Sequence, residues 1–291
     1  MKHLLPCRRP AIAAAFFAAM LLPASAQDAK PAAAPLPDPG VLRICASEVE
    51  APYSAKDGSG FENKVAVALA KAMGRKPVFV WTSQPAIYLV RDWLDKGSCD
   101  VVMGLDAGDE RVLTTTPYYR TGYVFVTRAD SKLAIANWQS EDLAKASHIG
   151  FVPGTPAQAM LEQRGLFNVH FNYMHSLTDF SDRRNKYSRI DPRRMIREVK
   201  EGKADVAIHF APDVARYVTA DKELKLTLIP DDNKTADGRK MPHHFDQSIA
   251  VRKGDAQLLA EIEAALTKAR PDIEAILREE GVPLIAQPNR S

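Results

Sequence analysis

The segment VLRICASEVEAPYSAKDGSGFENKVAVALAKAMGRKPVFVWT, residues 41–82, contains a strand, a helix and a second strand in immediate succession. The first strand is predicted at 41–45 and the second at 77–81, since both are short apolar runs. Between Gly60 and Gly74, apolar residues recur three and four positions apart, which is typical of a helix with one buried face. The segment therefore predicts a βαβ unit.

The same alternation continues along the chain. Ile87, Val90 and Leu94 mark a second helix that ends at Gly97, before a third strand at 99–104. Alternating strands and helices predict an α/β fold with a parallel sheet. Beyond it we expect further elements in this order: strand 123–127, strand 148–152, helix 156–164, helix 193–201, strand 205–209, helix 212–218, strand 247–251, and helices 256–269 and 273–280.

The amino-terminal residues predict secretion. Basic residues precede an apolar run, Ala11–Leu22, that ends in small residues up to Ala26. This pattern predicts a signal peptide at 1–26 and hence a periplasmic protein. Residues 27–40 are rich in Ala and Pro and predict a flexible leader.

The length that remains predicts two lobes, because it exceeds the usual size of a single core. We expect lobe 1 to combine 41–127 with 231–291, and lobe 2 to comprise 128–230. The chain would then cross twice between the lobes.

The charge balance argues against nucleic acid as a partner. The whole chain has 39 basic and 36 acidic residues. Lys2, Arg8 and Arg9 leave with the predicted signal peptide, which contains no acid, so the mature chain is formally neutral. Outside this segment no apolar run approaches the length that spans a membrane. We therefore predict no contact with nucleic acid or membrane.

Two cysteines, Cys45 and Cys99, remain in the mature chain. An even count in an oxidising compartment favours a disulfide. Two buried thiols are the alternative, because both residues lie in apolar, strand-like segments and sequence spacing does not establish their Cα distance.

Short motifs follow one another along nearly the whole mature chain. They are LRICAS with Pro52-Tyr53, Gly60-Phe61-Glu62, GSCDVVMG, Asp109-Glu110-Arg111, Pro117-Tyr118-Tyr119, Val152-Pro153-Gly154-Thr155, Gly202-Lys203-Ala204-Asp205 and Ile249–Asp255. In this order they resemble the type II periplasmic solute-binding proteins of amino-acid importers. The resemblance implies a two-lobed α/β fold with two mixed sheets, a double-crossing hinge, and a ligand cleft at the carboxyl ends of the strands.

Several positions that bind the amino acid in that family carry unsuitable residue types in this chain. Arg111 matches the position whose guanidinium binds the ligand carboxylate. The positions that share this carboxylate fall on Asp106 and Gly108, and the position that binds the ligand ammonium falls on Phe210. A phenylalanine cannot neutralise a buried ammonium. We therefore expect that the chain is not an ordinary amino-acid binder.

Longer strings carry a narrower resemblance. They are PAIYLVRDWLDKGSCDVVMG, DERVLTTTPYYRTGYVFVTR, SLTDFSDRRNKYSRID, APDVARYV and EAILREEGVPLI. They resemble the J proteins of bacterial methanol-oxidation systems (the MxaJ/MoxJ type). The resemblance implies a periplasmic accessory protein that interacts with a PQQ-dependent methanol dehydrogenase and assists its maturation or activity. It implies neither a cofactor nor catalytic residues.

The turns after the strands supply the predicted cleft residues: Glu48, Tyr53, Asp106, Arg111, Thr155 and Phe210. With Phe210 in place of an acid, we expect a cleft that takes an apolar molecule or a side chain of a partner. Glu48, Glu50 and Asp106 could together hold a cation, but loop acids occur at such spacings by chance, and we predict no metal site. We interpret four histidines as surface residues: His170, His175, His243 and His244.

Basic residues gather at 182–197 and predict a docking surface for an acidic partner. The predicted docking residues are Arg183, Arg184, Lys186 and Arg189. A solvated basic face is the alternative.

Two other functions stay open. One is the substrate-binding subunit of an importer for a small non-amino-acid solute, and the other is a lyase-like enzyme on the same fold. The sequence contains no Gly-x-Ser-x-Gly and no phosphate-binding loop, so we predict that the chain is not an enzyme.

Overall fold

The computed structural model describes residues 38–178 and 190–286. The predicted signal peptide at 1–26 and most of the predicted leader at 27–40 lie outside the described residues, as do the predicted docking residues Arg183, Arg184, Lys186 and Arg189. These assignments therefore stay predictions.

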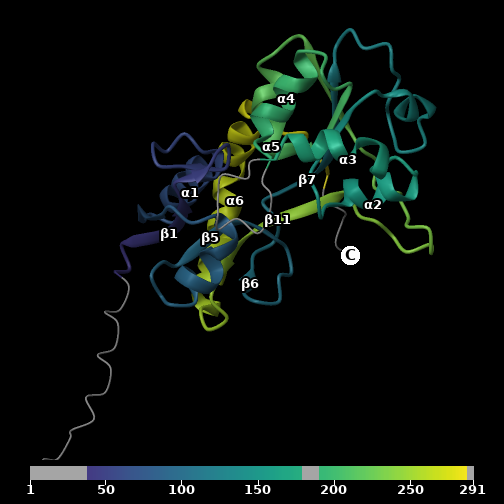
Figure 1. Cartoon of the computed structure of the whole chain (residues 1–291). Coiled ribbons are helices and arrows are strands. Elements are labelled where there is room, and N and C mark those ends of the chain that lie inside the picture. The colour runs from purple at the N-terminus through teal and green to yellow at the C-terminus, as the bar shows by residue number, and fades with distance from the viewer. Residues whose placement is uncertain (1–37, 179–189, 287–291) are drawn as a thin grey trace, which may run out of the picture. The chain divides into compact units, whose positions relative to one another are not determined.

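The predicted βαβ unit is present (Figure 1). β1 (Val41–Ser47) pairs in parallel with β4 (Lys76–Thr82), and α1 (Phe61–Ala72) connects the two strands. Parallel neighbours need such a crossover, which a tight turn cannot provide. β5 (Val101–Asp106) pairs in parallel with the other edge of β1. These elements, together with α6 (Ala256–Glu279), are called the first lobe below.

α1 follows directly from its sequence. Val65 and Leu69 are fully buried on one face, as their helical spacing predicts. The backbone N–H of Gly74 bonds to the carbonyl of Lys71, and its φ of +69° lies in the left-handed region that ends many helices. The observed ends of the helix agree with the predicted ones.

A second set of strands forms the second lobe. β9 (Val206–Phe210) pairs in parallel with β8 (Ile149–Phe151) and antiparallel with β7 (Tyr119–Arg128), which also pairs with β10 (Leu224–Leu228). The described residues of this lobe also form the α-helices α2 (Pro156–Gln163), α3 (Phe167–Ser176), α4 (Pro192–Lys200) and α5 (Ala211–Thr219) and the 3₁₀-helix η3 (Glu141–Lys145).

β11 (His244–Val251) joins the two lobes. Its first residues pair antiparallel with β7, and its later residues pair with β5 and the short β6 (Leu113–Thr114). The strands are consequently hydrogen-bonded in one path, β4-β1-β5-β11-β7-β9-β8, although we predicted two separate sheets. β11 is long enough to pair with strands of both lobes, which explains why the hydrogen-bonded path is continuous.

Separate hydrophobic cores accompany the two lobes. The core of the second lobe surrounds Trp138, Phe125 and Phe151, and that of the first lobe surrounds Phe61 and Leu42. The two-lobed α/β fold is thus confirmed. The predicted bounds of the lobes stay predictions.

Cys45 and Cys99 are disulfide-bonded, and their Cα atoms lie 5.4 Å apart. A small third core beside the bond contains Leu89, Val90 and Leu94. Val90 and Leu94 lie in the π-helix η2 (Val90–Leu94), and Leu89 links it to the 3₁₀-helix η1 (Ala86–Tyr88). The predicted second helix is thus present, in these two forms. Leu89, Val90 and Leu94 pack against this core, and 3₁₀ and π geometry occur in such short pieces.

The carboxyl-terminal helices were predicted incorrectly. We expected a break near Pro271, but α6 continues through it. Ala265, Leu266, Ala269 and Ile273 are buried on both sides of the proline, within the core that α6 shares with α1. The free energy gained by this burial offsets the loss of the backbone hydrogen bond that a proline causes in a helix. None of the helices that the structure describes is both long and apolar enough to cross a membrane.

Candidate ligand cleft

A cavity of about 420 Å³ is lined by residues of both lobes. The first lobe contributes the last residues of β1, and residues of β2 (Val49–Glu50), β3 (Ser54–Ala55), α1 and β5. The second lobe contributes the end of β9 and the first turn of α5. The cavity thus lies at the carboxyl ends of β1, β5 and β9, where ligands bind in open α/β sheets.

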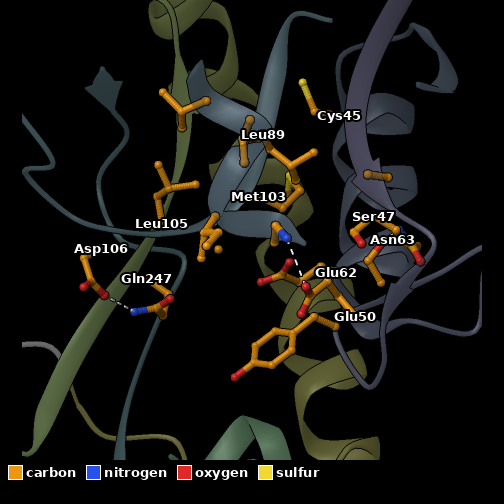
Figure 2. A pocket seen from close by; sticks show the side chains of 18 of the residues that line it. Cys45, Ser47, Glu50, Glu62, Asn63, Leu89, Met103, Leu105, Asp106 and Gln247 are labelled. Carbon is orange, nitrogen blue, oxygen red and sulfur yellow. Dashed lines mark hydrogen bonds between the residues drawn. The ribbon is translucent and has the colours of Figure 1, made fainter. Parts of the chain in front are cut away.

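Two glutamates of the first lobe lie next to each other in this cavity (Figure 2). Glu50 is buried at the end of β2 and accepts a hydrogen bond from the backbone N–H of Ala86 (3.0 Å). Glu62 lies in the first turn of α1 and is only 9 % exposed. Glu62 was not among the predicted cleft residues, and Glu50 was considered only with Glu48 and Asp106 as a possible cation site.

The carboxyl group of Glu62 is protonated at neutral pH. Burial raises its pKa to about 8; the neighbouring Glu50 and Asp213 add to the rise, and a hydrogen bond with Tyr118 opposes it. Because burial disfavours the charged form most, the carboxyl group keeps its proton. Glu62 is therefore a neutral donor and acceptor in the cavity wall.

Gly104 lies against the Glu62 carboxyl group. A Cβ atom at this position would overlap that group, at 2.7 Å from its Cδ. The φ of Gly104 is +68°, in the left-handed region that side chains disfavour. Both the space and the backbone conformation therefore require glycine here.

Asp213 brings a carboxylate from the second lobe into the cavity. It lies in the first turn of α5, where the helix dipole favours a negative charge. The Nδ1 atom of His209 lies 2.7 Å from its Oδ2 atom. Burial raises the pKa of the Tyr53 hydroxyl, and the charge of Asp213 and a hydrogen bond to it contribute, so Tyr53 stays a neutral neighbour of Asp213.

Asp213 was missed from the sequence because counting within the motif led to Phe210. The structure shows that β9 ends at Phe210 and α5 begins directly after it. An acid three residues later therefore falls in the first helical turn and faces the cleft. The Ala211-Pro212 pair, a common start of a helix, is the signal that could have located it.

Aromatic rings cover the wall beside Asp213. The ring centroids of Tyr123 and Phe210 lie 5.6 Å apart, and Phe245 lies 6.0 Å from each of them. Tyr53 packs against Phe61 at 5.1 Å. Apart from Phe61, these residues line the cavity, which combines aromatic surface with carboxyl groups.

The structure brings together four of the six predicted cleft residues: Tyr53, Asp106, Arg111 and Phe210. Asp106 accepts a hydrogen bond from the Nε2 atom of Gln247 (2.6 Å) (Figure 2). The guanidinium of Arg111 is paired with Asp109 (2.6 Å) and is 61 % exposed, so it already has an anionic partner.

Glu48 and Thr155 are not among the described residues that line the cavity. Glu48 forms an ion pair with Lys56. Thr155 precedes α2 and donates a hydrogen bond to the carbonyl of Val152 (2.6 Å). Both polar side chains are thus occupied by local partners.

Two histidines that we interpreted as surface residues are buried. His170 lies on α3, a helix that the sequence did not predict, and is 1 % exposed. His243 is fully buried and accepts a hydrogen bond at Nε2 from the indole N–H of Trp138 (2.9 Å). Burial lowers the pKa of His243, so it packs as a neutral residue. Within 38–178 and 190–286, no three metal-ligating side chains converge.

Comparisons with known proteins identify a family and several similar proteins. Residues 42–279 match the model of the bacterial extracellular solute-binding proteins, family 3. The chain is 54 % identical to Protein MoxJ of Methylorubrum extorquens, over 94 % of this chain and 92 % of that protein. It is 46 % identical to Protein MoxJ of Paracoccus denitrificans, over 86 % and 91 %. The crystal structure of MxaJ from Methlophaga aminisulfidivorans is similar with a TM-score of 0.80 and 46 % identity, over 84 % of this chain and all of that one.

Proposed function

We propose that this chain, which belongs to the bacterial extracellular solute-binding proteins of family 3 and to the MoxJ/MxaJ proteins within them, is a periplasmic accessory protein of methanol oxidation. It would interact with a PQQ-dependent methanol dehydrogenase and assist the maturation or activity of that enzyme. The observation that carries the proposal is the 54 % identity to Protein MoxJ over 94 % of the chain. The predicted signal peptide at 1–26 supports the periplasmic location.

The cleft supports a role other than amino-acid import. A zwitterion needs a free cation for its carboxylate, and Arg111 is already paired with Asp109. Asp106 and Glu50 line the same cavity and would disfavour a second carboxylate. The ordinary ligand of this family therefore has no suitable site here.

A catalytic role has less support than a binding role. Glu62 and the hydroxyl of Tyr118 are proton-carrying groups, and burial raises the pKa of both, so both stay protonated at neutral pH. Catalysis would also need a cationic or oxyanion-binding partner. Among the described cavity residues, the guanidinium that could act in this way is Arg111, which Asp109 occupies. We therefore propose a non-catalytic protein.

The second candidate function is the substrate-binding subunit of an importer for a small non-amino-acid solute. The cavity of about 420 Å³ between the lobes favours it, because its volume suits a small molecule. The two functions differ in what deletion of the gene should affect, namely dehydrogenase activity or uptake of a solute.

Contact with the dehydrogenase is tested by sedimentation velocity of the mature protein, alone and mixed with the purified enzyme. We expect a saturable, faster-sedimenting boundary that weakens with added salt, since exposed charges are screened. Replacing Arg183 and Arg184 by Glu should weaken the complex without unfolding the protein. Replacing Lys268 and Arg270, which are exposed on α6, by Glu changes the charge equally and serves as the control. Equal binding by both double variants would refute the docking segment.

A further inference from the structure

We infer that the cleft binds a small organic cation, an ammonium group on an apolar body, and excludes amino acids and carboxylates. The inference goes beyond the proposed contact with a dehydrogenase and does not depend on it. It rests on the polar groups of the cavity. An acid is present that can bind an ammonium group, whereas the guanidinium that could bind a carboxylate is already paired.

The anchor for the cation is Asp213. Its carboxylate lines the cavity and has two neighbours, His209 of the second lobe, whose Nδ1 lies 2.7 Å away, and Tyr53 of the first lobe. A carboxylate has about four lone-pair sites, so two neighbours leave acceptor capacity for a ligand N–H group. Asp213 thus replaces the acid that is missing at Phe210, and it is positioned before any ligand arrives.

The apolar body of the ligand has a matching surface next to this anchor. Phe210, Tyr123 and Phe245 form a continuous aromatic wall, with centroids 5.6–6.0 Å apart, and all three line the cavity. Aromatic faces attract cations as well as apolar groups. Ile87, Leu89 and Leu105 also line the cavity and add aliphatic surface.

The carboxylate of an amino acid has no corresponding site. Arg111 is bound by Asp109 through both its Nε and Nη2 atoms, at 3.0 and 2.6 Å. Apart from Arg111, the ionisable side chains among the described cavity residues are the carboxyl groups of Glu50, Glu62, Asp106 and Asp213 and the neutral phenols of Tyr53 and Tyr123. Placing an anion among these groups is unfavourable, whereas the same field stabilises a cation.

Calorimetric titration with three matched compounds tests the inference. Butylammonium carries the cation alone, L-norvaline adds a carboxylate to the same chain, and pentanoate replaces the cation by an anion. We expect saturable binding of butylammonium and weaker binding of the other two. In Asp213→Asn the affinity for butylammonium should fall about tenfold or more, because a charge-assisted hydrogen bond is lost. Asp130→Asn, an equal charge change at an exposed loop residue, should bind like the wild type.

A second variant keeps the test decisive if Asp213→Asn does not fold. Asp109→Asn releases the guanidinium of Arg111 at the exposed rim and should raise the affinity for L-norvaline.

The source of the cation is tested with Nα-acetyl-lysine methylamide. Tighter binding of this compound than of butylammonium would support binding of a cation and would assign the cation to a protein side chain. Tighter binding of L-norvaline or pentanoate than of butylammonium by the wild type would overturn the inference, as would no saturable binding of any cation. Neither result would argue against the proposed contact with the dehydrogenase, which is tested separately.

Discussion

Replacing Gly104 by Ala is expected to lower the free energy of unfolding by about 4 kcal/mol. Part of this loss comes from the backbone, because φ of +68° costs a residue with a Cβ atom about 1–2 kcal/mol. The rest comes from overlap with the carboxyl group of Glu62, which is buried and cannot move away freely. Denaturant unfolding followed by circular dichroism measures the loss.

Gly108→Ala separates the two contributions. Gly108 has a φ of +86°, but an added Cβ there meets no atom within 4 Å. This control should therefore lose only the backbone part, about 1–2 kcal/mol. Combining Gly104→Ala with Glu62→Ala should recover the overlap part in a double-mutant cycle. Equal losses in Gly104→Ala and Gly108→Ala would show that Glu62 does not lie against Gly104.

Replacing Glu62 by Gln is expected to stabilise the protein at alkaline pH, by an amount on the order of 4 kcal/mol. The pKa of Glu62 is about 8 in the folded chain and 4.5 in the unfolded one. Below pH 4.5 both states hold the proton and the residue costs nothing. Between pH 4.5 and about 8 the folded state keeps a proton that the unfolded state has lost, and above pH 8 it must bury a charge. The wild type therefore loses stability over this window.

Glutamine keeps the shape of the protonated acid and has no proton to lose. The melting temperatures of Glu62→Gln and the wild type should therefore be close at pH 4.5 and diverge towards pH 8.5, with the variant higher. Glu110→Gln, at an exposed residue, should follow the wild type at every pH. A difference between Glu62→Gln and the wild type that does not change with pH would mean that Glu62 titrates normally.

Much of the fold could be predicted because local signals decide it. α1 has buried residues at helical spacing and a left-handed glycine after its last turn, and its ends were predicted to within a residue or two. Pro271 was a misleading local signal, because burial of α6 against α1 outweighs the hydrogen bond that the proline removes. α3 was missed for a similar reason: its amphipathic pattern is weak, and packing on β8 holds it in place.

The cleft was predicted less completely because its electrostatics depend on tertiary contacts. The sequence identified Asp106 and Phe210 at the ends of strands, but the pairing of Arg111 with Asp109 is a matter of side-chain geometry. Glu62 was interpreted only as part of the Gly60-Phe61-Glu62 motif that opens a helix. Its raised pKa depends first on burial, and then on groups of other elements such as Glu50 of β2 and Asp213 of α5. Asp213 required the end of β9 to be known to the residue.

The central claim is that the chain assists a methanol dehydrogenase. The specific activity of that enzyme in periplasmic extracts tests this claim most directly, because an artificial electron acceptor and added methanol bypass any transport. In a strain that lacks the gene for this chain, we expect the activity to fall to background and to return when the wild-type gene is restored. Full dehydrogenase activity in extracts of the deletion strain, with loss of uptake of a solute instead, would contradict the account.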